Sequence, residues 1–334
     1  MNRRAMRSNR FSIVLAVLLA SLAYPAVNAS GESICSQVTL HTFESSSGLP
    51  ALLCVPDGSG PFPAIVDLQP RICEGYAALG PPWEQAELPA RGYVLLEIDS
   101  FAARGLAPGK CEDLNVLGSR QVIGDAYAGL KFLAQDSRVD RRRVGVLGFL
   151  GGIATAAIFA TTREARRTFL PDDSPAFRAA FAFYPYCNLE FTGASPNFDA
   201  PIRIFIGEKD DMEPANRCVE LAQSLHAHGA NMETIVYPGA EAGFDITPPD
   251  TNYPLPDRTS LHPGGMTVST HPQYSPWGYN FAACTIRLKS IFDLVDPAEV
   301  AGCMRRGVHF QGNAASAEQA RADLKDQMKL LMGE

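Results

Sequence analysis

The sequence has little positive charge: its 334 residues carry 29 lysines and arginines against 36 aspartates and glutamates, a net charge of −7. Domains that bind nucleic acid usually have a basic balance or a basic patch, so we expect no nucleic-acid partner. Sequence motifs typical of metal-binding and phosphate-binding sites are absent as well. No zinc-type spacing occurs, and Gly148, Gly151 and Gly152 lack the lysine and serine or threonine of a phosphate-binding loop. We therefore expect no metal ion and no cofactor.

The apolar run near the N-terminus is short. Residues 11–23 fall below the roughly 20 apolar residues that a membrane-spanning helix needs. Four arginines precede this run and the small residues Val27 and Ala29 follow it, as in a secretory signal peptide. The sequence predicts a signal peptide at residues 1–29, export to the periplasm or the extracellular space, and no membrane contact after cleavage. A membrane anchor is the alternative.

All eight cysteines follow the predicted cleavage point. An even number of cysteines in an exported chain indicates disulfide bonds. We predict four bridges in chain order: Cys35–Cys54, Cys73–Cys111, Cys187–Cys218 and Cys284–Cys303. The alternative is that several of these thiols are free and buried as small apolar groups.

Short apolar runs alternate with helical stretches along residues 30–334, which we interpret as one domain. Alternation of this kind predicts βαβ units, a mostly parallel sheet and helices on both faces. The expected strands lie at residues 37–43, 49–55, 63–68, 93–98, 144–147, 179–184, 202–206 and 233–237. The expected helices lie at residues 121–135, 151–161, 216–228, 279–294 and 315–331. Residues 245–277 are rich in Pro, Gly, Ser and Thr and predict a long irregular insertion, either a binding lid or a solvated loop.

The run VGVLGFLGG at residues 144–152 leads from the predicted strand into a helix of small residues. A strand that turns sharply into a helix between glycines is typical of the nucleophile elbow G-x-S-x-G, which presents its central side chain above the sheet. Gly148 and Gly152 are the flanking glycines of the pattern. Leu150 stands where the nucleophile belongs.

With these motifs the chain resembles the dienelactone hydrolase family of the α/β-hydrolase superfamily, especially its exported, cysteine-rich members. The resemblance extends over about residues 35–294 and keeps the order nucleophile, acid, histidine. It implies an α/β-hydrolase fold, with a doubly wound, mostly parallel sheet, and hydrolysis of an ester or lactone through acyl transfer. Besides the elbow, the segments that carry it are DSFAARG at 99–105 followed by Cys111, GEKDDMEP at 207–214 and YPGAEAGFD at 237–245.

By this resemblance the catalytic positions are Leu150, Asp210 and Ala242, and only Asp210 keeps a competent side chain. Leucine has no lone pair with which to attack a carbonyl, and alanine cannot accept a proton. Loss of such groups costs up to about a millionfold in kcat. The sequence therefore predicts a catalytically degenerate member of the family. Structural roles also fit these residues: Leu150 could fill the former pocket and Asp210 could be a hydrogen-bonded loop carboxylate.

The segment that the resemblance assigns to the oxyanion hole also differs from the family motif. Where the family has His-Gly, this chain reads Gln69, Pro70 and Arg71, and a proline has no N–H to donate. Cys73 in the same loop is a candidate nucleophile only if it is not bridged to Cys111. Arg104 fits an ion pair better than a substrate clamp.

Four histidines bear on a replacement base. His226 and His228 are two residues apart on a predicted helix and do not share a face. His262 and His271 lie in the predicted irregular insertion, from which they could reach the cleft.

Three functions follow from these alternatives. The first is a non-catalytic family member that keeps its cleft for a small ester-like or lactone-like ligand or for a protein partner. The second is an active ester or lactone hydrolase with rearranged residues. The third is a structural envelope protein that has no ligand.

Overall fold

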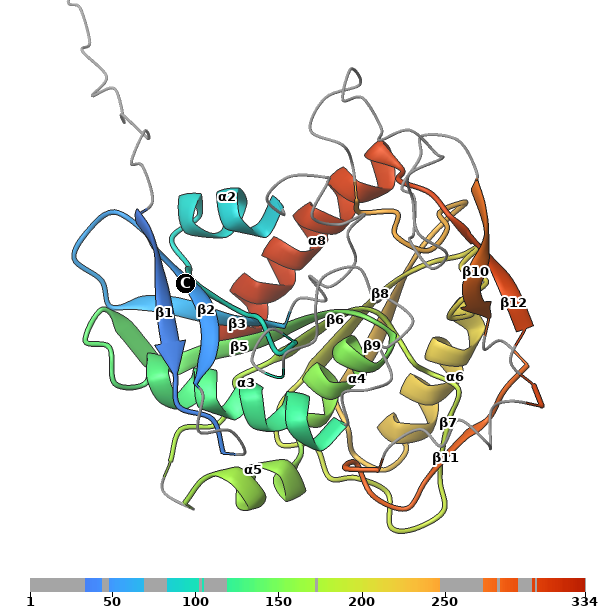
Figure 1. Ribbon diagram of the computed structural model, residues 1–334, viewed down its shortest axis with the longest axis horizontal. Coiled ribbons are helices and arrows are strands. Elements are labelled where there is room, and N and C mark those ends of the chain that lie inside the picture. The colour runs from blue at the N-terminus through green and yellow to red at the C-terminus, as the bar shows by residue number, and fades with distance from the viewer. Residues whose placement is uncertain are drawn as a thin grey trace, which may run out of the picture. The chain divides into compact units, whose positions relative to one another are not determined.

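An eight-stranded sheet forms the centre of the fold (Figure 1). The strands follow the order β1-β2-β4-β3-β5-β6-β8-β9; β1 and β2 are antiparallel to their neighbours and all the others run parallel. Their bounds are β1 Ile34–Leu40, β2 Leu49–Val55, β3 Phe62–Leu68, β4 Val94–Ile98, β5 Val139–Leu150, β6 Ala180–Pro185, β8 Ile202–Gly207 and β9 Met232–Tyr237. The computed structural model describes residues 34–43, 48–68, 83–101, 104, 119–171, 174–246, 273–280, 283–293, 302–303 and 305–333.

Helices cover both faces of this sheet (Figure 1). Helices α2 and α8 lie on one face, and α3, α4 and α6 lie on the other. The apolar face predicted for α3 is buried through Val122, Ala126 and Leu130, which explains why its spacing was readable in the sequence. The helices are α2 Trp83–Ala90, α3 Ser119–Leu133, α4 Gly151–Phe159, α5 Arg163–Phe169, α6 Ala215–His226 and α8 Ala314–Met332. The predicted doubly wound α/β-hydrolase fold is confirmed.

The prediction of a helix at residues 279–294 is wrong. The chain there continues strand β10 (Gln273–Asn280) and then forms strand β11 (Ile286–Leu288), which pairs in parallel with β7 (Leu189–Phe191). Burial alternates residue by residue from Cys284 to Leu288, which is the period of a strand and not of a helix. Of the apolar side chains that suggested a helix, Ile286 and Leu288 lie on β11, whereas Ile291 and Phe292 lie in the turn that follows it.

Strand β10 also begins inside the insertion that was predicted to be irregular up to residue 277. It pairs in antiparallel fashion with β12 (Arg305–Phe310), an element that the sequence did not predict. Residues 247–272 of the insertion lie outside the described residues, as do residues 1–29, the predicted signal peptide.

Three of the four predicted disulfides are confirmed: Cys35–Cys54, Cys187–Cys218 and Cys284–Cys303. The first joins directly opposed residues of the antiparallel pair β1 and β2. The predicted bridge Cys73–Cys111 lies outside the described residues. None of the described helices combines the length and the apolarity that a membrane crossing requires.

The bridge pattern predicts that the unfolded, unreduced protein has no reactive thiol. Thiol counting with a chromogenic disulfide reagent in denaturant checks this result directly. A count of two thiols per chain would show that Cys73 and Cys111 are free and would revive Cys73 as a candidate nucleophile.

Candidate functional site

The predicted strand-to-helix corner is present at the carboxyl end of β5. Strand β5 ends at Leu150 and helix α4 begins at Gly151. Leu150 has φ 68° and ψ 116°, a region that a residue with a branched side chain occupies at a cost of about 1–3 kcal/mol. A backbone held in such a conformation presents its side chain above the sheet. Here that side chain is an isobutyl group, and it is buried.

The glycines of the corner have different roles. A Cβ on Gly148 would lie 2.8 Å from the Cβ of Ala157, so only glycine lets strand β5 approach helix α4 this closely. Gly151 has φ 44°, and a Cβ there would lie 2.9 Å from the ring of Tyr186. At Gly152 a Cβ would make an ordinary 3.5 Å contact. The second glycine that the corner needs is therefore Gly151 rather than the motif glycine Gly152.

Asp210 is buried in the loop after β8, with 4% of its surface exposed. Its Oδ1 accepts the backbone N–H groups of Met212 (3.0 Å) and Glu213 (2.8 Å). Its Oδ2 is also buried, yet it has no hydrogen-bond partner among the described residues. Burial raises the pKa of Asp210 to about 7, against the two N–H bonds, which lower it. One carboxylate oxygen is thus anchored by the loop and the other has no donor.

Two more acidic residues near Asp210, Glu213 and Glu241, were not predicted from the sequence. Glu213 is 1% exposed, and neither of its carboxyl oxygens has a hydrogen-bond partner within the described part of the chain. Glu241 leaves its buried Oε2 without a partner as well. Burial, followed by repulsion from Asp210, raises the pKa of Glu213 well above its usual range. Glu213 belongs to the segment GEKDDMEP at residues 207–214, which we call the acid loop, but nothing in that segment distinguishes a buried glutamate from an exposed one.

Ala242 lies in the loop after β9 and is fully buried. Its carbonyl accepts the N–H of Gln311 at 3.1 Å, and the carbonyl of Phe244 accepts the N–H of Asn313 at 2.9 Å. The segment that joins β12 to α8 therefore runs beside the loop in which the family has its histidine. A methyl group occupies the position where an imidazole would be expected by resemblance.

An imidazole does approach the acid loop, but from a different element. The backbone N–H of His309, on strand β12, donates to Asp211 Oδ1 at 2.9 Å, and His309 Nδ1 lies 2.7 Å from Asp211 Oδ2. Both side chains are partly exposed, at 47% and 31%. Nothing in the sequence links His309 to Asp211, which is 98 residues away in the chain. The two histidines of the predicted insertion, His262 and His271, lie outside the described residues.

His226 and His228 contact the backbone near the end of helix α6. His226 Nδ1 lies 3.2 Å from the carbonyl oxygen of Ala230, and His228 Nδ1 lies 2.8 Å from that of Ser224. The two rings have different partners, Ala230 and Ser224.

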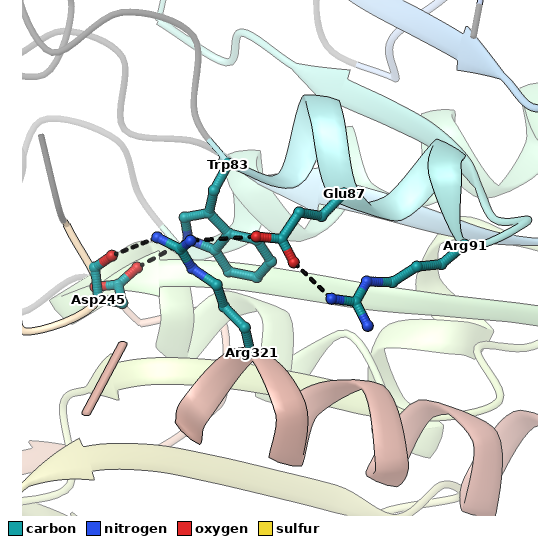
Figure 2. Close-up of polar contacts among 5 residues, drawn as sticks. All are labelled: Trp83, Glu87, Arg91, Asp245 and Arg321. Carbon is teal, nitrogen blue, oxygen red and sulfur yellow. Dashed lines mark hydrogen bonds and ion pairs between the residues drawn. The ribbon is translucent and has the colours of Figure 1, made fainter. Parts of the chain in front are cut away.

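Asp245 lies at the end of the loop that contains Ala242, and its contacts anchor that loop (Figure 2). It is 2% exposed, and its carboxylate accepts hydrogen bonds from the Tyr184 hydroxyl and, at 3.3 Å, from the indole N–H of Trp83. Arg321 of helix α8 donates to the Asp245 carbonyl at 3.3 Å and to Glu87 at 3.2 Å. Its guanidinium also lies 5.2 Å from the centre of the Trp83 ring. These contacts tie helices α2 and α8 to the loop that contains Ala242.

A buried acid lies beside this network. Glu84 on α2 is 2% exposed, and its Oε2 has no partner in the ranges described. Burial, then the nearby carboxylates of Asp67 and Asp245, raise the pKa of Glu84 well above its usual range. The charged form of Glu84 is therefore disfavoured in the folded protein.

Arg104 forms the ion pair that the sequence favoured. Its guanidinium bonds both oxygens of the buried Asp125, at 2.8 and 3.1 Å, and the carbonyl of Ser100 at 2.5 Å. This fork-to-fork geometry joins Arg104 to helix α3, which contains Asp125. The predicted oxyanion segment of Gln69, Pro70 and Arg71 lies outside the described residues. Within those that are described, no three His, Cys, Asp or Glu side chains are arranged to hold a metal ion.

Comparisons with known proteins agree with this architecture. The model of the dienelactone hydrolase family matches residues 72–256, more than half of the chain. A Bradyrhizobium protein described as a 2-oxo-3-(5-oxofuran-2-ylidene)propanoate lactonase is 28% identical over 142 residues, which are 39% of this chain and 52% of that protein. The chain thus spans about half the length of that curated relative.

A solved structure supports the fold. A protein of Klebsiella pneumoniae subsp. pneumoniae, described as a dienelactone hydrolase, superimposes with a TM-score of 0.52 at 19% identity. The superposition covers 64% of this chain and 89% of that one. The family match, the order of the strands and the strand-to-helix corner at Leu150 lead to one conclusion: this chain belongs to the dienelactone hydrolase family and has its α/β-hydrolase fold.

Proposed function

We propose that this protein is an exported member of the dienelactone hydrolase family that does not hydrolyse esters through a covalent intermediate and instead binds a small ester-like or lactone-like molecule at the former catalytic site. The observation that carries the proposal is the side chain at the corner. Leu150 occupies the strained backbone position that a nucleophile requires, yet a hydrocarbon can neither attack a carbonyl nor hold a proton.

The surroundings of Asp210 support the same proposal. In an acid–histidine pair one carboxylate oxygen accepts the imidazole N–H. Asp210 keeps the backbone N–H bonds on Oδ1, whereas its Oδ2 is buried without a donor. An oxygen of this kind is expected where an imidazole has been lost and the rest of the loop has kept its shape.

Export rests on separate observations. The N-terminal arginines and the apolar run at residues 11–23 are typical of a signal peptide. Disulfides such as the three in the described residues persist in oxidising compartments and are rare in the cytosol.

One observation favours the second candidate, an active hydrolase with rearranged residues. His309 and Asp211, a residue of the acid loop, form a histidine–carboxylate pair, and such a pair could activate a water molecule as a general base. Direct attack by water would need no nucleophile at Leu150. Both side chains are partly exposed to solvent. The pair therefore lacks the water-excluded surroundings in which electrostatic interactions stabilise a transition state most strongly.

A substrate panel separates the two candidates. The substrates are p-nitrophenyl acetate, p-nitrophenyl butyrate and unsaturated γ-lactones. We expect the wild type to hydrolyse them no faster than the His309→Ala variant does at the same protein concentration. Turnover that falls at least tenfold in His309→Ala and in Asp211→Asn, but not in Leu150→Ala, would contradict the proposed function and establish the alternative.

A further inference from the structure

A pocket lies between helices α2 and α8, on the face of the sheet that these two helices cover (Figure 1). It has about 230 Å³ of free space, part of which is open to solvent. We call it the α2–α8 pocket. Leu150, Asp210 and Ala242 do not line it, so it is separate from the former catalytic site.

The floor of the α2–α8 pocket is apolar. Leu88 on α2 and Leu324 and Met328 on α8 line it and are only 1–2% exposed. The rings of Trp83 and Tyr93 also line the pocket. Apolar walls with a few charged groups are typical of sites for small molecules. Because the free space is below the roughly 300–1,000 Å³ of a drug-sized site, the ligand that fits is small.

Positive charge exceeds negative charge around this floor. The charged side chains that line the pocket are three cations and one anion: Arg91, Arg321, Lys325 and Glu87. Figure 2 shows that two of the cations share the one carboxylate: Glu87 lies 2.8 Å from Arg91 and 3.2 Å from Arg321. Lys325 is exposed and forms no ion pair within the described ranges. The excess is local, since the chain as a whole has a net charge of −7.

The surroundings of Tyr93 point in the same direction. Burial raises the pKa of Tyr93, against the positive charges of Arg143 and Lys329, which lower it. Arg143 is paired with Asp140, at 2.8 Å, yet both cations lie close enough to act on this wall of the pocket. A region with an excess of positive charge attracts an anion and raises its local concentration.

We propose that the α2–α8 pocket binds a small organic acid, whose carboxylate pairs with Arg91 and Lys325 and whose apolar part packs on the floor. Arg91 uses one guanidinium nitrogen for Glu87, and a guanidinium has five N–H donors, so donors remain for a ligand. Charge-assisted hydrogen bonds of this kind are about twice as strong as neutral ones. The inference adds a second site to the protein and does not depend on the proposed function.

Trp83 gives a direct readout of binding, because it lines the pocket and the chain has only one other tryptophan, Trp277. The two indole N–H signals of protein labelled with 15N-tryptophan are assigned through Trp277→Phe. The wild type is then titrated with benzoate at pH 7 and constant ionic strength. Benzamide, which has a similar shape but no charge, and benzamidinium, which has the opposite charge, are the control ligands.

We expect the Trp83 indole signal to shift saturably with benzoate, with a Kd on the order of 1 mM, which suits so small a ligand. Benzamide and benzamidinium should leave it unshifted. Lys325→Gln and Arg91→Gln should each weaken binding about five- to tenfold, because each removes a charged partner of the carboxylate. Lys131→Gln is the matched control. It removes an exposed lysine of α3, on the other face of the sheet, and should change the Kd less than twofold.

Four results would overturn this inference: no saturable shift with benzoate, an equal shift with benzamide, unchanged binding in Lys325→Gln and Arg91→Gln, or equal weakening in Lys131→Gln. The second would show that the charge of the ligand is irrelevant. The third would place benzoate elsewhere, and the fourth would indicate general charge attraction. None of these measurements involves ester turnover, so the test is independent of the substrate panel.

Discussion

The double variant Leu150→Ser/Ala242→His should gain ester hydrolysis, at about a hundredfold or more above the wild type in kcat/KM. The corner already has the positive φ that presents a hydroxyl above the sheet, and replacement of the isobutyl group removes bulk from that position. A histidine at residue 242 would supply the N–H that the buried Oδ2 of Asp210 lacks. General-base activation of this kind contributes roughly 10²–10⁴-fold. Initial rates on p-nitrophenyl acetate measure the gain.

The single variants are the matched controls. Leu150→Ser alone provides a hydroxyl without a base, and Ala242→His alone provides a base without a nucleophile, so each should remain near the wild-type rate. Addition of Asp210→Asn to the double variant should remove most of the gain, because the imidazole would lose its orienting carboxylate. A folded double variant that is no faster than either single variant would show that the loops no longer bring positions 150, 210 and 242 together.

Stability should fall as pH rises from about 4 to 8, because burial raises the pKa values of several acids in the folded protein. Asp210 has a pKa of about 7 in the folded state against 3.8 for an ordinary aspartate, and burial also raises the pKa of Glu213, Glu84 and Asp245. Between these two pKa values the carboxyl group is protonated in the folded protein and ionised in the unfolded chain. Its contribution to the free energy of unfolding is therefore fully present below about pH 4 and is lost as the pH rises through about 7. For Asp210 alone the loss is about 4 kcal/mol.

Guanidinium unfolding of the oxidised protein at a series of pH values checks this prediction. The midpoint should decrease from pH 4.5 to pH 8, and Asp210→Asn should flatten that decrease, since an amide does not titrate. Asp326→Asn, which removes an exposed carboxylate of helix α8, serves as the control and should retain the wild-type slope. A midpoint that is constant or increases over this range would mean that Asp210 is ionised in the folded protein, which would contradict its isolation from cations.

Much of the fold could be predicted because the strands of a parallel sheet are short apolar runs and helix α3 has a clear apolar face. Prediction failed where tertiary pairing decides the structure. Residues 279–294 contain enough apolar side chains to suggest a helix, but parallel pairing of β11 with β7 and the Cys284–Cys303 bridge fix part of the segment as a strand. Strand β12 was missed because its partner β10 begins inside the segment rich in Pro, Gly, Ser and Thr, where no strand was expected.

The site was predictable only in part. Motif order locates Leu150, Asp210 and Ala242, and the glycine pattern indicates the corner between β5 and α4. No local pattern shows that Glu213 and Glu84 are buried, because their burial depends on packing against distant elements. The contact between His309 and Asp211 is equally invisible in the sequence, since it joins β12 to a loop 98 residues away.

The most direct test of a site without a nucleophile is intact-protein mass spectrometry after incubation with a fluorophosphonate. Such reagents and activated esters label an activated side-chain nucleophile covalently. The wild type is predicted to keep its unlabelled mass, while Leu150→Ser/Ala242→His gains one adduct at residue 150. A stoichiometric adduct on the wild type, at any side chain, would show that this protein retains a working nucleophile and would contradict the account.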